Sequence, residues 1–475
     1  MRISAAFLAL AVLGTLVSAA ATPPEKQVFT RHWTTRDQQT GRYQYVPFDV
    51  APGTTSVTVS YRYNRAAGNN VIDFGLFEPG PLALGSPAFR GWSGGARDTV
   101  TIAMDGATPG YWPGPLPAGR WHAILGLYEV ADTGVDVEIA VETSTAPAVQ
   151  QSPTLPQRAK EAVRPGPAWY AGALHTHTIH SDGALTSQQL ADKAVAEKLD
   201  FLAITDHNNT THQLDPIHAP GLLIITGEEV TTPGGHFGVL GLEGQRTYVD
   251  FRMPSRSPDI GPVMTAARAR GALIAINHPS DDCLACSWTH SVPPEVSAIE
   301  IANGEPVARQ LAMTLWDALL REGRRLTALG ESDYHRGPTP LGTPSVRVWA
   351  QELSRPAILA SIGSGRVVVM ANGSMPPPEL TVRAGRVQGR VGDALRVKPG
   401  EPLQVSVEAV AADYKGGRVE LYWNGEQVAS ATMPDTARVE FERFATTAGY
   451  LRIHLLGAGG QPLAITNPVF IEIAA

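Results

Sequence analysis

The sequence contains very little cysteine: Cys283 and Cys286, spaced Cys-x-x-Cys, are the only two among 475 residues. Two thiols exclude a four-thiolate zinc site, and the polar loop around them lacks the strand-to-helix context of a redox-active pair. In an exported chain such a pair more often closes a local disulfide. We therefore expect a disulfide that fastens one loop and is dispensable for chemistry.

An excess of basic residues is also missing, since 38 Lys and Arg stand against 45 Asp and Glu, a formal net charge of −7. A protein that steers nucleic acid usually carries a basic stripe or patch. The composition argues against such a surface and favours a small-molecule substrate. It leaves the oligomeric state undetermined.

The apolar run at 7–17 is shorter than the roughly 20 residues that a membrane-spanning helix needs. It follows Arg2 and precedes small residues up to Ala21, a pattern typical of a cleaved export signal over residues 1–21. No later segment is apolar enough to span a bilayer. We therefore expect an exported protein, periplasmic or secreted, without a membrane anchor.

The length of the chain exceeds what one hydrophobic core usually supports, which suggests about two to four domains. Alternation at period two predicts a β-sandwich or jelly roll over 24–145 and an Ig-like β-sandwich over 373–475. Residues 146–167 lack periodicity and read as a linker. Over 168–372, strand followed by helix recurs about seven times, which predicts an α/β barrel. We assign neither β-domain a catalytic group.

Four aromatic residues of the first β-domain could line a sugar-binding face, but the sandwich core is the better expectation for them. They are Trp92, Tyr111, Trp112 and Trp121.

Ten of the thirteen histidines lie between His175 and His335. His175 and His177 are two apart at a predicted strand end, so their side chains leave the same face. His236 precedes its strand and must reach the others from a loop. The strand-end candidates are His175, His177, Asp182, His207, Glu229, His236, His278, Asp333 and His335. Imidazoles and carboxylates without thiolate suit Zn, Mn or Fe, and nine ligands imply two or three divalent ions.

Several of these residues stand in motifs that resemble the PHP (polymerase and histidinol phosphatase) superfamily. The motifs are His175-Thr-His177, Ser181-Asp182-Gly183, Thr205-Asp-His207, His278-Pro279 and Asp333-Tyr-His335, with Glu229 and His236 between them. The flanking β-domains make the chain similar to the exported carbaryl-hydrolase-like branch. The resemblance covers about 169–372 and implies a distorted seven-stranded (β/α) barrel with three metals. It implies a first metal on His175, His177, Glu229 and Asp333, a second on Glu229, His236 and His278, and a third on Asp182, His207 and His335.

Metals a few Å apart depress the pKa of a bridging water and hold the oxygens of a charged transition state. We therefore expect hydrolysis by a metal-bridging hydroxide, with Asp333, His207 and Asp182 as catalytic residues. The resemblance favours phosphate esters, and Arg336 as the sole cation in the motif-bearing loops favours a phosphodiester or small phosphomonoester. Carbamate or carboxyl ester hydrolysis is the alternative, and a non-catalytic exported ligand-binding protein is the second.

Some assignments stay open at the level of sequence. Glu228 stands beside Glu229 and could be the bridging carboxylate, although spacing favours Glu229. His180 could replace Asp182 as a ligand, and Asp206 is placed to fix a ligand imidazole. The residues expected to hold the substrate are Arg336, Asn303, Tyr334 and His290.

Overall fold

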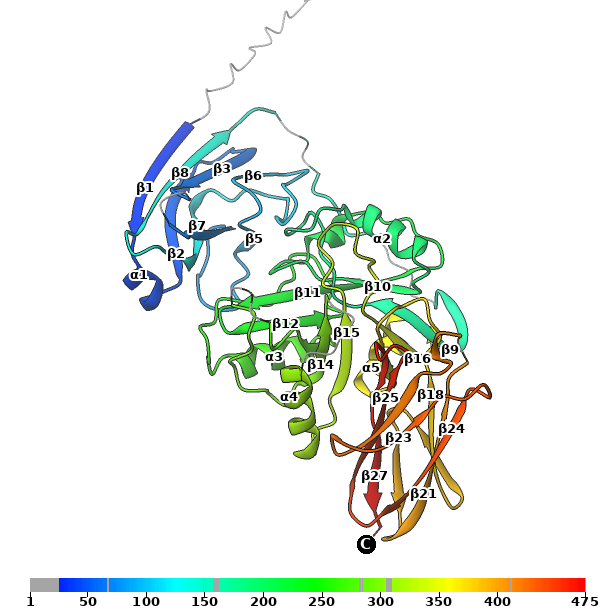
Figure 1. The fold of residues 1–475 in the computed structure, drawn as a ribbon. Coiled ribbons are helices and arrows are strands. Elements are labelled where there is room, and N and C mark those ends of the chain that lie inside the picture. Colours follow the sequence, from blue (N-terminus) through cyan, green and yellow to red (C-terminus); the bar gives the residue numbers. More distant parts are fainter. Residues whose placement is uncertain are drawn as a thin grey trace, which may run out of the picture.

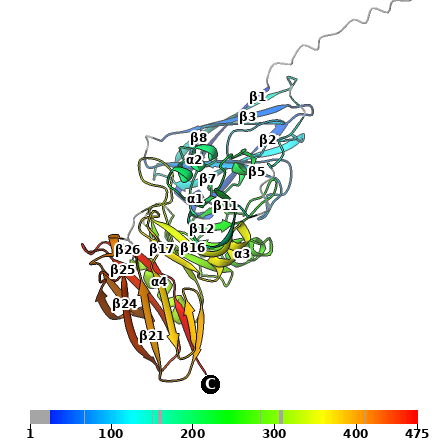
Figure 2. The same ribbon diagram turned by 90° about the vertical axis from the view of Figure 1, so that its right-hand side faces the viewer.

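The computed structural model describes residues 25–65, 68–147, 149, 151–156, 162–281, 283, 285–304, 310–410 and 412–474. The expected export signal at 1–21 lies outside this range. Three parts follow one another along the molecule: a β-sandwich, a central part with helices, and a second β-sandwich (Figures 1 and 2). No helix in the described residues is both long and apolar enough to cross a membrane.

The N-terminal sandwich consists of two four-stranded sheets. The first has the order β1 (Glu25–Trp33), β8 (Val135–Ser144), β3 (Ser56–Tyr63) and β6 (Thr99–Ala103); the second has β2 (Tyr43–Val50), β7 (Gly119–Glu129), β4 (Val71–Phe77) and β5 (Phe89–Gly94). Helix α1 (Thr35–Thr40) joins β1 to β2. Burial alternates along β3 and β8, as period-two strands of a sandwich require. The four aromatic residues expected in the core are all buried.

The central part carries a continuous sheet in the order β15-β14-β13-β12-β11-β10-β9-β16-β17. Its strands are β9 (Arg164–Ala173), β10 (Phe201–Ile204), β11 (Leu223–Thr232), β12 (Gly235–Leu240), β13 (Leu273–Ile276), β14 (Val296–Asn303), β15 (Thr327–Glu331), β16 (Ser345–Leu353) and β17 (Val367–Met370). Its helices are α2 (Ser187–Ala196), η1 (Thr211–Leu214), α3 (Ile260–Ala269), α4 (Gln310–Arg321) and α5 (Arg355–Gly363).

The expected sevenfold strand–helix repeat is not what the described residues show, because only four α-helices accompany these nine strands. Strands β11 and β12 form an antiparallel hairpin, and β16 is antiparallel to both β9 and β17. A hairpin needs only a short turn, whereas a parallel pair needs a crossover that usually carries a helix. The ladder curls until Gly330 of β15 lies against Val369 of β17, where an added Cβ would come within 2.4 Å of the valine side chain.

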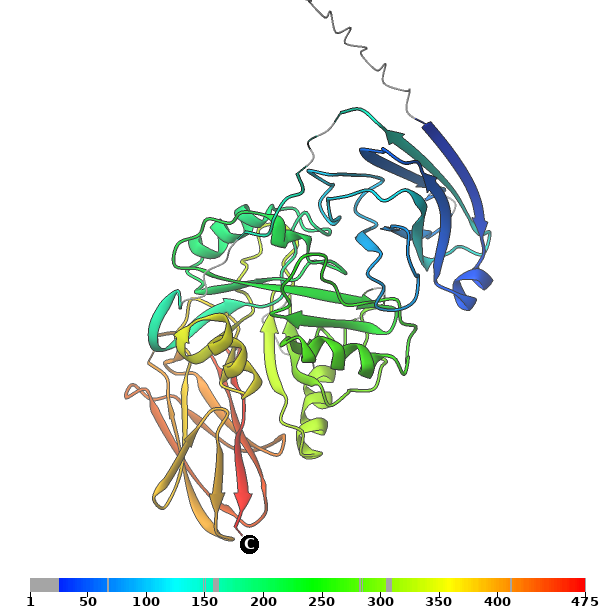
Figure 3. The same ribbon diagram turned by 180° about the vertical axis from the view of Figure 1, so that it is seen from behind.

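The C-terminal sandwich shares a sheet with the central part, since β17 pairs with β26 (Pro462–Thr466). Figure 3 shows this sandwich directly below the central part. That sheet continues through β25 (Gly449–Leu456), β22 (Arg418–Trp423) and β23 (Glu426–Thr432), with β20 (Ala394–Val397) and β27 (Val469–Ile473) attached at its side. The opposing sheet has β19 (Val387–Arg390), β18 (Glu379–Ala384), β21 (Glu401–Glu408) and β24 (Arg438–Ala445), and η2 (Ala412–Tyr414) lies between β21 and β22.

The N-terminal sandwich packs against the central part through the sheet that contains β2, β7, β4 and β5. The rings of Trp92 and Phe251 lie 4.6 Å apart, and both belong to one hydrophobic core with Tyr128 and Phe237. This shared core fixes one face of the sandwich beside the carboxyl ends of the central strands. Those strand ends carry the histidine cluster.

Candidate metal centre

The motif segments meet because backbone hydrogen bonds tie the strand ends together. Thr205 N donates to Thr176 O over 2.9 Å, and His177 N donates to Tyr334 O over 2.9 Å. A parallel bridge also joins His207 to Glu229. Segments more than 150 residues apart in the chain are thereby placed at one edge of the sheet.

Glu229 lies at the centre of the cluster, and its two carboxylate oxygens face different imidazoles. Oε1 lies 3.2 Å from His175 Nε2, 3.3 Å from His236 Nδ1 and 2.9 Å from His278 Nε2. Oε2 lies 3.4 Å from His177 Nε2 and 3.0 Å from His207 Nδ1. A carboxylate with this arrangement is placed as a bridging ligand would be.

Glu229 occupies this position because it lies inside β11, which continues to Thr232 instead of ending before the glutamates. Glu228 consequently points to the other face and accepts a hydrogen bond from Val249 N at 2.8 Å. His236 pairs with Thr231 within the β11–β12 hairpin, so it reaches the cluster from a strand and not from a loop. The geometry therefore selects Glu229 over Glu228.

Two aspartates complete the cluster at its outer end. Asp333 Oδ1 lies 3.2 Å from His175 Nε2 and 3.0 Å from His177 Nε2. Asp182 Oδ1 lies 3.2 Å from His335 Nε2 and 3.7 Å from His207 Nε2. Asp333 has a φ of 49°, in the left-handed region that strained functional residues often occupy.

The cluster is closed at one end and open at the other. The side chains of His175, His177 and Glu229 are at most 2% exposed. Those of Asp182 and His335 are 43% and 26% exposed. Access from solvent is therefore at the end formed by these last two residues.

The groups of the cluster differ in charge. It contains ionised carboxyl groups together with both protonated and neutral imidazoles. Burial opposes ionisation of Glu229, but His175 and His207 hold the pKa of its carboxyl well below its usual range. Burial also works against protonation of His207, yet Glu229 and Asp182 raise its pKa to about 10. Burial, together with His335 and then His207, lowers the pKa of His177 to about 4. His177 is therefore neutral at pH 7, the state in which imidazole binds a metal.

The residues fit divalent metal ions. Overlapping groups of ligand atoms lie within 4.8 Å of one another, among them the two sets His175, His177, Glu229, Asp333 and His177, Asp182, His207, His335. His177 Nδ1 and His236 Nε2 are buried and make no hydrogen bond. Buried polar atoms without partners are costly in a folded protein, and a metal ion would satisfy them. Divalent metal binding is thus what this donor set supports, with neither the metal nor the number of ions fixed.

Glu300, which sequence reasoning missed, orients one of the candidate ligands. Its Oε1 lies 2.8 Å from His175 Nδ1, and its Oε2 accepts hydrogen bonds from His278 N and Asn303 Nδ2, each at 2.9 Å. A carboxylate behind an imidazole fixes the tautomer and orientation of the ring. The sequence signal was a lone glutamate inside the apolar strand 296–303.

From the sequence we expected Asp206 to fix a ligand imidazole, but in the structure it does not. It accepts hydrogen bonds from Thr178 Oγ1 at 2.8 Å and Ser181 Oγ at 2.7 Å, and it pairs with His212. These contacts hold the loop between His177 and Asp182. Two other partners orient ligand imidazoles: Thr231 Oγ1 lies 2.6 Å from His207 Nδ1, and the carbonyl of Asp333 lies 2.8 Å from His335 Nδ1.

His180, the alternative to Asp182, is turned away from the cluster. Its Nε2 lies 3.0 Å from Asp215 Oδ2 and its Nδ1 lies 2.8 Å from Thr211 Oγ1. Both ring nitrogens are thereby occupied, and Asp182 is the residue that joins His207 and His335.

The four residues expected to hold substrate fall into two groups. Arg336 lies at the open end, where its Nη2 donates to the carbonyl of Asp182 at 2.8 Å. The other three make internal hydrogen bonds: Asn303 to Glu300, His290 Nε2 with Thr232 Oγ1 at 2.9 Å, and Tyr334 Oη to the carbonyl of Gly337 at 3.2 Å. Of the four, Arg336 is the one that lies at the accessible end.

The N-terminal sandwich also contributes a titratable group that interacts electrostatically with the cluster, although no catalytic group was expected from this domain. Asp73 of β4 lies opposite Gly126 of β7, on the sheet face that packs against the central part. Burial raises the pKa of Asp73 to about 7, with a further contribution from Asp182 that His207 and Arg42 oppose. Arg97 of the same sandwich donates from Nη2 to the carbonyl of Ile179 at 2.8 Å. The first β-domain therefore flanks the loop that carries Asp182.

No family model matches the sequence. Over 143 residues the chain is 33% identical to the 5'-3' exoribonuclease Rnm of Salmonella typhimurium. The aligned stretch covers 29% of this chain and 44% of that protein. The chain thus spans less than half the length of this curated relative.

Two solved structures show limited similarity. A two-domain protein from Bacteroides vulgatus, described as containing a predicted PHP-like metal-dependent phosphoesterase, aligns with a TM-score of 0.38 at 18% identity, over 66% of this chain and all of that one. Superoxide reductase from Ignicoccus hospitalis aligns with a TM-score of 0.16 at 15% identity, over 20% of this chain and 83% of that one.

Proposed function

We propose that the protein is an exported, metal-dependent phosphoesterase that hydrolyses a phosphodiester or a small phosphomonoester. The observation that carries the proposal is the position of Glu229, whose two oxygens face five imidazoles from four segments of the central part. The partial identity to an exoribonuclease, an enzyme that cleaves phosphodiesters, supports the same choice of substrate class.

Divalent ions held by this cluster would supply an activated water and would stabilise negative charge on the oxygens of the ester. The protein's own residues supply the rest. Glu300 holds the imidazole of His175 in place, while Thr231 does the same for His207. Arg336 and Arg97 flank the loop at the accessible end, where a guanidinium can orient a phosphate by paired hydrogen bonds.

The accessible end also limits the substrate. Asp182 and Asp333 bring negative charge to it, and the chain as a whole has a net charge of −7. The cations described beside it are Arg336 and Arg97. A polyanion would meet repulsion there, whereas an ester with a single phosphate needs only one or two guanidinium contacts. We therefore restrict the substrate class to small diesters and small monoesters, with diesters first.

Export is supported by the residue pattern at 1–21 and by the Cys283–Cys286 disulfide, because disulfides persist mainly in oxidising compartments. Mass analysis of the mature N-terminus in a fractionated native host tests this part. Recovery of the intact N-terminus from the cytoplasm would contradict it.

The catalytic part is tested with nitrophenyl phosphate monoester and diester, a short oligoribonucleotide and a naphthyl carbamate, each with Mn or Zn present. We expect turnover of the diester to exceed that of the monoester, and loss of both in His175→Ala/His177→Ala with metal removed from the cluster. His454→Ala is the matched control, because His454 stacks on Tyr422 in the C-terminal sandwich. Activity confined to the carbamate would replace the phosphoesterase by a carbamate hydrolase.

A further inference from the structure

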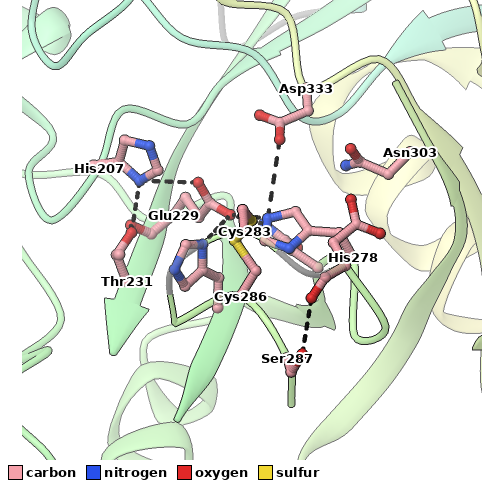
Figure 4. Close-up of a disulfide and its surroundings, with 12 residues drawn as sticks. His207, Glu229, Thr231, His278, Cys283, Cys286, Ser287, Asn303 and Asp333 are labelled. Atoms are coloured by element: carbon pink, nitrogen blue, oxygen red, sulfur yellow. Dashed lines mark hydrogen bonds and ion pairs between the residues drawn. A yellow bond between two sulfur atoms is a disulfide. The ribbon is translucent and has the colours of Figure 1, made fainter. Parts of the chain in front are cut away.

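The disulfide between Cys283 and Cys286 lies against the candidate metal centre. The Cys286 sulfur, one ring nitrogen of His236 and one of His278 all lie within 4.8 Å of one another. Figure 4 shows the disulfide beside Glu229 and His278. Cys286 is buried, at 4% exposure. From the sequence we expected only that this pair fastens a polar loop and is dispensable for chemistry.

The two histidines at this corner point independently to a ligand. The His236 side chain is 7% exposed; its Nε2 makes no hydrogen bond, and its Nδ1 lies 3.3 Å from Glu229 Oε1. His278 Nδ1 is likewise buried without a hydrogen bond, and its Nε2 faces Glu229 at 2.9 Å. His278 has a φ of 26°, a left-handed conformation that the surrounding structure must hold in place.

The position of Cys286 does not depend on the disulfide alone. Directly after it, Trp288 N donates to the carbonyl of Pro279 at 3.0 Å and Thr289 N donates to the carbonyl of Gly234 at 2.8 Å. The Trp288 ring lies edge-on to Phe237 of β12, with ring centroids 6.5 Å apart. These contacts fasten the loop to the hairpin that carries His236, so Cys286 would remain near the imidazoles if the disulfide were opened.

Sulfur changes its ligand character with its oxidation state. A disulfide sulfur is a poor metal ligand, whereas a thiolate binds zinc and other soft divalent ions strongly. Reduction of the disulfide by a dithiol breaks the sulfur–sulfur bond, takes up two electrons and two protons, and yields two thiols while the dithiol becomes a disulfide. Metal binding then releases the proton of the Cys286 thiol.

We propose that Cys286 is a redox-gated ligand, which joins His236 and His278 at a site for a zinc-like ion when the disulfide is reduced. The inference rests on the proposed function in that His236 and His278 belong to its metal cluster. In the oxidised protein the corner has nitrogen and oxygen donors alone. In the reduced protein a sulfur donor is added, which shifts preference from manganese towards zinc.

Cobalt is a suitable probe, because thiolate coordination gives Co²⁺ a charge-transfer absorption in the near ultraviolet. Protein stripped with a chelator is reduced with a phosphine, which takes up oxygen from water to form its oxide, and is desalted before Co²⁺ is added. We expect no such band in the oxidised protein and a band after reduction. Cys283→Ser, which keeps only the buried cysteine, should show the band without any reductant.

Cys286→Ser is the matched control, because it keeps only the exposed cysteine and should show no band in either state. Reduced wild type provides a second measurement if Cys283→Ser fails to fold. Cobalt bound to reduced wild type and to Cys283→Ser without a sulfur band would overturn the redox-gated ligand and leave the phosphoesterase proposal intact. Failure of the wild type to bind cobalt in either state would overturn both.

Discussion

Glu300 offers the sharpest test of how the protein positions its candidate metal ligands. The side chain is 2% exposed and accepts hydrogen bonds from three nitrogens, those of His175, His278 and Asn303. Substitution by glutamine preserves its shape but replaces one oxygen by an NH₂ group. That group cannot accept a hydrogen bond from the donors that it now faces.

Either orientation of the new amide is unfavourable. If its NH₂ faces His175 Nδ1, that nitrogen must accept, and the proton moves to Nε2, which is the nitrogen 3.2 Å from both Glu229 and Asp333. His175 then presents a proton where a metal needs a lone pair. If the NH₂ faces His278 N and Asn303 Nδ2 instead, two buried donors lose their acceptor, at about 1–3 kcal/mol each.

We expect Glu300→Gln to weaken metal binding roughly 10–100-fold, the usual effect of losing a carboxylate behind a ligand imidazole. At about 1.4 kcal/mol per tenfold change, this corresponds to about 1.4–2.8 kcal/mol. The assay is competition for Zn²⁺ with a chromophoric chelator, combined with thermal unfolding to show that the variant folds.

Glu331→Gln is the matched control, because Glu331 also lies buried near His175 and accepts a hydrogen bond from Leu174 N at 2.6 Å. Burial raises the pKa of Glu331 well above its usual range, which favours the neutral acid, and an amide can replace a neutral acid. Its metal affinity should stay close to that of the wild type. Equal affinity of folded Glu300→Gln and wild type, or an equal loss in both variants, would refute the reasoning.

Two further substitutions test the domains on either side. The pKa of Asp73 lies at about 7, above its ordinary value of 3.8, so stability present below about pH 4 is lost as pH rises through about 7. In chelator-treated protein, the unfolding midpoint of Asp73→Asn should therefore rise relative to that of wild type between about pH 5 and pH 8. A difference in midpoint that stays the same at every pH would contradict this. Asp317 of α4 contacts buried Arg452 at 2.8 Å, so Asp317→Ala should cost about 3–5 kcal/mol in unfolding free energy. The control for Asp317→Ala is Asp435→Ala, since Asp435 forms an exposed pair with Lys415. Equal losses of unfolding free energy in the two variants would show that the buried pair does not join the central part to the C-terminal sandwich.

The sequence was informative where one local rule determines position. Thr186 caps α2 through a capping box with Gln189, as a Ser/Thr before an apolar stripe predicts. His175 and His207 follow strands β9 and β10, which are parallel neighbours. The carboxyl ends of parallel strands lie at the same edge of a sheet, so residues just after them meet.

The residues that were missed depend on partners far away in the chain. Glu300 lies inside an apolar strand, 125 residues from the histidine that it orients, and no spacing rule connects them. Asp73 belongs to another domain and approaches the cluster only through the packing of two hydrophobic surfaces. Cys286 was interpreted from its spacing to Cys283, which predicted their disulfide but not the metal-site neighbours of that disulfide.

The β11–β12 hairpin shows why a barrel inferred from a repeat differs from the structure and why the difference matters for the site. The run after Thr226 continues as strand because Gly235, with a φ of 118°, lets the chain turn back after Thr232. Strand geometry then sends Glu228 and Glu229 to opposite faces, which a loop would not enforce. Backbone pairing on both sides, to His207 after β10 and to Gly238 of β12, holds Glu229 among the five imidazoles. A metal site needs ligands held in fixed positions, and a hairpin in place of a strand–helix unit holds the central carboxylate more securely than a strand-end loop could.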